Sequence, residues 1–190
     1  KALGVVYPCF CTRKDIQAEI AAAERAPHGP DGPLYPGICK KLTRVEQTRL
    51  RADNQPHAWR LDLSAALKIL SHPLSWHDQV CGLVPAIPEI LGDIVLARKD
   101  TPTSYHLSVV VDDGLQNITH ITRGKDLFHA THIHVVLQKL LGLPTPSYHH
   151  HALLTDTDGI RFAKRNKSVT LQDIQRQGID TATLIHSLGL

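Results

Sequence analysis

Three cysteines and one tyrosine near the start of the chain have the side chains and the spacing of a metal site. Cys9 and Cys11 are separated by one residue, and Tyr35 lies four residues before Cys39. Thiolates suit Zn²⁺, because this borderline-soft ion accepts tetrahedral, sulfur-rich coordination without redox chemistry. If the proline- and glycine-rich segment between the two pairs folds back, all four side chains reach one centre. The spacing favours zinc over the alternative, a set of buried free thiols.

The remaining cysteine and the histidines do not extend this site. Cys81 has no partner in the sequence, and we expect it to be a small core residue. Residues 149–151 are three consecutive histidines, which cannot all face one metal, and we place them in a loop. His129 and His132 share one face of an expected helix, where a hydrogen-bonded structural role is favoured over ligation.

A second group of residues has side chains that suit the binding of an acidic, phosphorylated or RNA ligand. Arg123 precedes a glycine, and a guanidinium can clamp a carboxylate with two charge-assisted hydrogen bonds. Taken alone, it is equally a surface charge or a partner of Asp126. Lys164 lies in a basic loop, which by itself indicates a solvated surface or a contact with RNA phosphates.

The elements that must position these residues include both helices and strands. Helix formers, end signals and apolar stripes predict helices over residues 15–25, 44–52, 64–71, 130–141, 171–177 and 181–188. Alternating and β-branched runs predict strands over residues 57–63, 76–83, 93–98, 105–111 and 117–122. The sequence Asp112-Asp113-Gly114 indicates a turn, so we expect antiparallel pairing of the strands on either side of it.

Composition bounds the class of protein. The 190 residues can bury a core of their own, giving one domain or one domain with an insertion. The formal net charge of +3 provides no overall basic field that would by itself indicate a nucleic-acid partner. No apolar run reaches the roughly 18 residues of a membrane span, so we expect a cytoplasmic protein without a membrane partner. The chain opens on Lys1 rather than methionine, and we expect the sequence to be incomplete.

Several blocks of the chain closely resemble, in order and spacing, the glutamyl-tRNA synthetase family of class I synthetases. The matching blocks are residues 92–100, 105–113, 118–127, 131–134, 137–142, 146–148 and 158–165. The last block resembles the KMSKS loop of the family; Phe162 and Ala163 depart from its pattern, while Lys164 keeps its second lysine. The resemblance implies that Tyr105 and Arg123 bind L-glutamate. It also implies that ATP, with Mg²⁺, is a substrate whose phosphates Lys164 stabilises during catalysis as pyrophosphate leaves.

The first part of the chain is similar to one branch of that family, the glutamyl-Q tRNA(Asp) synthetases. Residues 7–13 and 34–39 match the Cys-x-Cys and Tyr-x-x-x-Cys motif of this branch, in which the tyrosine is a zinc ligand. The segment between Cys11 and Tyr35 is longer than in the branch and is interpreted as an insertion. The resemblance implies transfer of activated glutamate to the queuosine of the tRNA(Asp) anticodon, and we expect a monomer.

The resemblance implies an α/β fold. We expect a zinc-bearing connective subdomain over residues 1–116, inserted into the domain, and the C-terminal half of a Rossmann-like class I synthetase catalytic domain over residues 117–190. The HIGH motif of the family has no match, so we expect this polypeptide alone to form no adenylate. Two alternatives stay open: an ordinary glutamyl-tRNA synthetase truncated at both ends, and a non-catalytic, zinc-stabilised RNA-binding module.

Overall fold

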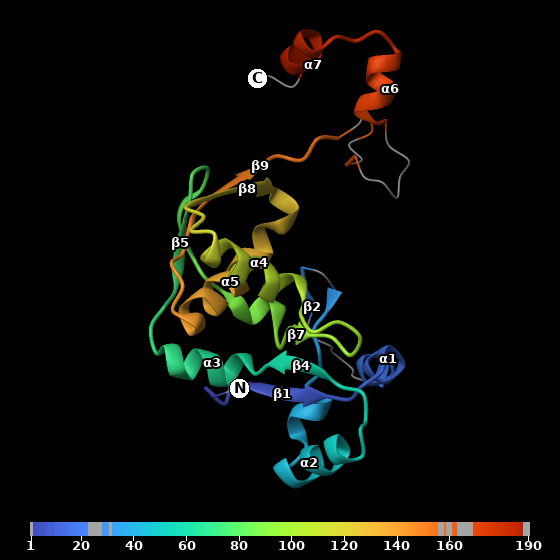
Figure 1. Cartoon of the computed structure of the whole chain (residues 1–190), viewed down its shortest axis with the longest axis vertical. Coiled ribbons are helices and arrows are strands. Elements are labelled where there is room, and N and C mark those ends of the chain that lie inside the picture. The colour runs from blue at the N-terminus through green and yellow to red at the C-terminus, as the bar shows by residue number, and fades with distance from the viewer. Residues whose placement is uncertain are drawn as a thin grey trace. The chain divides into compact units, whose positions relative to one another are not determined.

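The structure, a computed structural model, consists of two compact units. Unit 1 is Lys1–His151 and unit 2 is Ala152–Leu190. The described residues are 2–22, 28–30, 32–155, 158, 161–162 and 169–187. Figure 1 colours the chain by residue number and labels its elements.

A three-stranded antiparallel sheet lies at the start of unit 1. Its strands are β1 (Val6–Cys9), β4 (Ala58–Leu61) and β7 (Val95–Ala97), in the order β1-β4-β7. The register pairs Tyr7 with Arg60. The expected strands over 57–63 and 93–98 are therefore confirmed, with shorter bounds.

Helices, 3-10 turns and a short hairpin lie between these strands in the sequence. The helices are α1 (Arg13–Ala22), α2 (Arg44–Ala52) and α3 (Leu63–Leu70), and the 3-10 turns are η1 (Ile38–Lys41) and η2 (Pro88–Leu91). The hairpin consists of the two-residue strands β2 (His28–Gly29) and β3 (Gly32–Pro33). Thr43 forms a capping box with Glu46 at the start of α2, and the Asp62 side chain accepts a hydrogen bond from the Ala65 N–H at the start of α3. These caps satisfy backbone N–H groups that a helix leaves unpaired, so local sequence sets where both helices begin.

The second sheet has four strands in the order β6-β5-β9-β8. β5 (Ser75–Asp78) pairs antiparallel with β6 (Gly82–Pro85) and parallel with β9 (Ser147–His151), which is parallel to β8 (His120–Gly124). The turn η3 (Lys125–Leu127) and the helix α5 (Phe128–Leu141) connect β8 to β9. This β-α-β unit confirms the expected mixed α/β content with a parallel sheet. Two of the four strands come from before residue 117.

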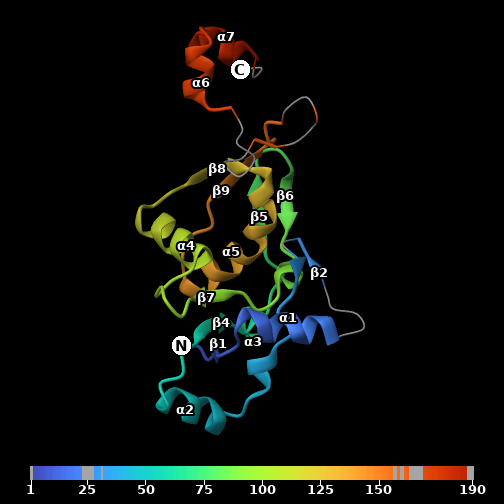
Figure 2. The same cartoon turned by 90° about the vertical axis from the view of Figure 1, so that its right-hand side faces the viewer.

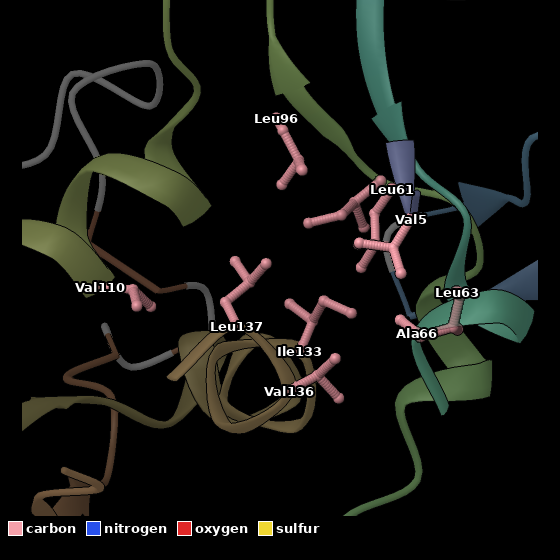
Figure 3. Packing of buried hydrophobic residues seen from close by; sticks show 10 residues of the cluster. Val5, Leu61, Leu63, Ala66, Leu96, Val110, Ile133, Val136 and Leu137 are labelled. Atoms are coloured by element: carbon pink, nitrogen blue, oxygen red, sulfur yellow. The ribbon is translucent and has the colours of Figure 1, made fainter. Parts of the chain in front are cut away.

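Helix α5 (Phe128–Leu141) joins the two sheets. Figures 1 and 2 show α5 and helix α4 (Tyr105–Leu115) between the sheets. Figure 3 shows Ile133, Val136 and Leu137 of α5 facing Val5 and Leu61 of the first sheet region across the main core. Eight consecutive residues of α5, from 131 to 138, are buried. A helix buried this completely must also bury polar side chains, and those need partners.

Two predictions for residues 105–114 are wrong. Residues 105–111 form helix α4 (Tyr105–Leu115) rather than a strand, so 112–114 is helical and not a turn. The three consecutive valines favour a strand, but the Ser104 hydroxyl caps the helix at the Leu107 N–H, and Val110 is 1% exposed in the core. Packing thus overrides a weak β-propensity.

The other errors lie in the second sheet. The predicted strand over 76–83 is a hairpin, because the Asp78 side chain accepts hydrogen bonds from the N–H groups of Val80 and Cys81 and turns the chain. That turn leaves Cys81 exposed rather than in the core. Residues 149–151 belong to strand β9 and not to a loop.

In unit 2, helices α6 (Leu171–Arg176) and α7 (Thr181–Ser187) confirm the two predicted C-terminal helices. Thr170 and Asp173 form a capping box at the start of α6. Lys164 lies outside the described residues, so its role stays a prediction. Within the described parts of the chain, no helix is both long enough and apolar enough to pass through a membrane.

Candidate functional site

The structure brings together the four residues that the sequence predicts as metal ligands. Cys9 is the last residue of β1, and Cys11 follows two residues later. Cys39 lies in η1, after the segment over which the chain folds back. The three sulfurs lie within 4.8 Å of one another, and 3.3 Å separates the Sγ atoms of Cys11 and Cys39. The Tyr35 hydroxyl oxygen lies 3.3 Å from the Cys9 Sγ and 3.5 Å from the Cys11 Sγ.

This donor set fits a tetrahedral metal ion. Metal–sulfur bonds of about 2.3 Å place sulfurs about 3.8 Å apart around zinc, which is close to the observed spacing. The Arg60 guanidinium lies 3.8 Å above the Tyr35 ring centroid and supplies positive charge beside the sulfurs. Burial raises the pKa of the Cys9 thiol, but hydrogen bonding with Tyr35 and the nearby Arg60 charge outweigh burial and bring it below its usual value. Burial instead raises the pKa of the Cys11 thiol to about 12, so the closeness of the donor atoms and the lowered pKa of Cys9 are what fit a metal ion.

Asp93 ties this cluster to the sheet. Its carboxylate accepts a hydrogen bond of 2.7 Å from the Tyr7 hydroxyl and lies 3.2 Å from the Lys40 ammonium nitrogen. Its backbone carbonyl accepts a hydrogen bond of 2.7 Å from Arg60 Nη1. The backbone carbonyl of Asp93 thus holds the Arg60 guanidinium in place beside the sulfurs.

Arg123 lies at the centre of a second cluster, on β8. Its Nε–H donates a hydrogen bond of 3.0 Å to His150 Nε2, and its Nη2 donates to the Thr131 hydroxyl. Its Nη1 lies 3.3 Å from His134 Nδ1. These three contacts use three of the five N–H groups of a guanidinium. Among contacts with the described residues, one N–H on each terminal nitrogen remains, which is the number that a two-point clamp on a carboxylate needs.

The cluster sits at the carboxyl ends of three strands that run parallel. Arg123 pairs with His150 in the register of β8 and β9, and Asp78 is the last residue of β5. His150 and Asp78 are 4% and 0% exposed, and 2.5 Å separates His150 Nδ1 from Asp78 Oδ2. In open α/β sheets, ligands bind outside the carboxyl ends of the strands. The location is therefore that of a ligand site.

Tyr105 approaches the same cluster from a helix rather than from a neighbouring strand. It is the first residue of α4 and is half exposed. Its ring centroid lies 5.8 Å from that of His134, the residue that also contacts Arg123. Tyr105 lines a hollow of about 1050 Å³ together with His106 and Arg98. Tyr105 and Arg123 thus both lie beside His134, while Lys164 lies outside the described residues.

Four residues of this cluster are not identifiable as site residues from the sequence alone: Asp78, Thr131, His134 and His150. One available signal was the alternation in β9, where Tyr148 and His150 are buried and their neighbours are less so. Burial lowers the pKa of His134 to about 2, with the charge of Arg123 adding to the effect. His134 is therefore neutral at pH 7 and can accept a hydrogen bond at Nδ1 from Arg123.

Comparison with known proteins gives consistent results. The family model described as tRNA synthetases class I (E and Q), catalytic domain, matches residues 2–190. A glutamyl-Q tRNA(Asp) synthetase from Rhodobacter capsulatus is 44% identical over an alignment of 199 residues. The alignment covers 98% of this chain and 68% of the relative. One from Symbiobacterium thermophilum is 37% identical over 191 residues, covering 100% of this chain and 56% of the relative.

A solved structure shares the fold. The crystal structure of a glutamate tRNA ligase from Elizabethkingia meningosepticum in complex with its amino acid superposes with a TM-score of 0.67. It is 22% identical and covers 95% of this chain and 36% of that chain. The chain spans between 56% and 68% of the length of the two curated relatives named here.

The buried histidine gives the first testable prediction. The pKa of His134 is lowered in the folded state, so the unfolded chain takes up a proton at a pH where the folded chain does not. Stability is therefore full above pH 6.5 and falls as the pH drops, by about 2 kcal/mol from this histidine at pH 5. We expect His134→Gln to reduce the loss of unfolding free energy between pH 7 and 5 by about that amount, measured by urea denaturation.

A variant at the exposed His72, His72→Gln, controls for the loss of one histidine. If the His134→Gln protein loses as much stability between pH 7 and 5 as the wild type, His134 does not stay neutral in the folded protein.

Proposed function

We propose, because this chain belongs to the family of class I tRNA synthetases for glutamate and glutamine, that it carries the glutamate-binding part of an enzyme that activates glutamate with ATP. The observation that carries the proposal is the Arg123 guanidinium, which three side chains hold at the carboxyl ends of parallel strands. Among the described residues, they leave one N–H on each terminal nitrogen for a ligand. The names of the curated relatives support the acceptor: the queuosine of tRNA(Asp).

Arg123 and Tyr105 supply complementary contacts for glutamate. A fork of two N–H groups on a guanidinium matches the two oxygens of one carboxylate, and such charge-assisted contacts contribute about 1.5–3 kcal/mol each. Tyr105 is half exposed, its ring centroid lies 5.8 Å from that of His134, and its hydroxyl can donate a further hydrogen bond to the ligand. His134, neutral and 2% exposed, lies beside both residues without adding charge.

Lys164 is proposed to act on ATP. In activation, an oxygen of the glutamate carboxylate attacks the α-phosphorus, the bond to pyrophosphate breaks, and negative charge develops on the departing phosphates. A lysine placed near that charge stabilises the transition state more than the ground state. Family membership and the sequence of residues 158–165 support this role, with Mg²⁺ as the companion of ATP.

Zinc is the metal we propose for Cys9, Cys11, Tyr35 and Cys39. When bound, it would be structural, because a site closed by four protein ligands leaves no open position for chemistry. Three thiolates and a protonated Tyr35 hydroxyl around Zn²⁺ carry one net negative charge, which the Arg60 guanidinium beside Tyr35 balances. The metal would hold a region that buries few apolar side chains of its own.

Transfer of glutamate tests the proposed function directly. We expect the full-length protein, given ATP and radiolabelled glutamate, to label tRNA(Asp) that contains queuosine, and to leave tRNA(Glu) and queuosine-free tRNA(Asp) unlabelled. Labelling of tRNA(Glu) instead would identify an ordinary glutamyl-tRNA synthetase. No labelling and no glutamate-dependent ATP–pyrophosphate exchange would refute the enzyme and favour a non-catalytic RNA-binding module.

The clamp gives a sharper prediction for glutamate itself. Arg123→Lys keeps the charge but removes the planar fork, so we expect the glutamate Kd from calorimetry to rise about tenfold or more. Lys164→Ala should instead leave glutamate binding nearly unchanged and reduce pyrophosphate exchange strongly. Equal effects of the two variants on glutamate binding would contradict the separate roles of clamp and phosphate stabiliser.

The cysteines allow a matched test of the metal. We expect about one zinc per chain by metal analysis of protein purified without chelator, and much less for Cys11→Ser because one thiolate ligand is lost. Cys81→Ser changes the same atom at an exposed position away from the cluster and should retain the metal. A wild-type protein with far less than one zinc per chain would show that the cluster is a set of free thiols.

A further inference from the structure

Asp78 has both carboxylate oxygens engaged although it is fully buried. Oδ1 accepts hydrogen bonds of 2.9 and 3.0 Å from the N–H groups of Val80 and Cys81. Oδ2 lies 2.5 Å from His150 Nδ1. Although burial raises the pKa of Asp78, the hydrogen bonds with His150 and the two N–H groups outweigh burial and lower it. Asp78 is therefore ionised at pH 7 and can only accept, so the proton of this pair sits on His150 Nδ1.

A fixed proton on Nδ1 determines what the other side of the ring can do. Burial lowers the pKa of His150, and although the hydrogen bond with Asp78 raises it, burial and the charge of Arg123 outweigh that bond, so the imidazole is neutral at pH 7. A neutral ring with Nδ1–H has a lone pair on Nε2. That lone pair faces the Arg123 Nε–H at 3.0 Å. The opposite tautomer would set two N–H donors against each other.

We infer that Asp78 and His150 are positioning residues, which fix the tautomer of one ring so that it holds the Nε edge of Arg123 and turns the terminal nitrogens toward a carboxylate ligand. The chain of contacts runs from the Asp78 carboxylate through the imidazole to the guanidinium. Both residues act through Arg123 and need not touch the ligand. This role rests on the proposed function for its choice of glutamate as the ligand.

The remaining contacts of Arg123 agree with this role. Thr131 and His134, both on α5, accept from its terminal nitrogens, and α5 is fixed in turn by the apolar core. Without the acceptor on His150, the Nε edge would be unpaired, and the side chain would have to be ordered when the ligand binds. Ordering a long side chain on binding weakens affinity by roughly three- to tenfold, and a donor facing a donor weakens it further.

Asp78→Asn is the informative variant. The Asn oxygen still accepts from Val80 and Cys81, while its amide now donates to His150 Nδ1 and moves the ring proton to Nε2. In the full-length protein we expect two changes: ¹⁵N NMR of the histidine rings shows the proton moving from Nδ1 to Nε2, and the Arg123 Nε–H exchanges faster with water. We also expect the KM for glutamate to rise about tenfold or more, with the KM for ATP changed less than twofold.

His150 provides an independent pair of variants in case Asp78→Asn does not fold. Gln at position 150 can offer a carbonyl oxygen to the Arg123 Nε–H, whereas Leu offers none. We expect His150→Gln to keep the glutamate KM within about threefold of wild type, and His150→Leu to lose at least tenfold. For Asp78→Asn, the control is Asp53→Asn, an equal change of charge at the exposed C-terminal end of α2.

The outcomes separate the positioning role from the proposed function. Equal glutamate affinity in His150→Gln and His150→Leu, or an unchanged Arg123 Nε–H exchange rate in Asp78→Asn, would overturn the positioning role. A wild-type protein that binds no glutamate would overturn the proposed function, while the exchange rate of the Arg123 Nε–H would still decide whether Asp78 and His150 position it.

Discussion

A guanidinium held at the ends of buried strands needs its charge balanced and its N–H groups accepted, and this requirement organises the centre of unit 1. The acceptors for Arg123 come from different elements, with His150 on β9 and Thr131 and His134 on α5. The balancing carboxylate, Asp78, comes from β5 and reaches Arg123 only through His150. The sheet and the helix must therefore dock together before this side chain has any fixed direction.

Helix α5 makes that docking compatible with a hydrophobic core. One side carries Ile133, Val136 and Leu137 into the main apolar cluster, and another presents Thr131 and His134 to Arg123. Since the helix is buried from 131 to 138, its polar side chains have no water to bond with and must find protein partners. Burial of the helix thus selects the polar network, and the network in turn fixes the arginine.

The cysteine cluster uses the same principle with opposite charges. Here the group with the lowered pKa is the Cys9 thiol, and Arg60, held by the Asp93 carbonyl, is the cation that favours its thiolate. The surrounding cluster contains few apolar side chains, so a bound metal would replace the hydrophobic packing that this region lacks. Each centre is a compact set of charges that is assembled by contacts between residues distant in the sequence.

The sequence by itself determined the local features and the family. Thr43 and Thr170 set helix starts through their capping boxes. The sequence also contains the apolar stripe that predicts α5 and the spacing that predicts the four residues of the cysteine cluster. Only the tertiary structure decided that residues 105–115 are helical, because the packing of that segment outweighs the β-propensity of its valines. It alone paired Asp78 with His150, which are 72 positions apart. Parallel strands joined by long crossovers bring distant residues to one edge of a sheet, and strand register, which no local pattern encodes, chooses which of them meet.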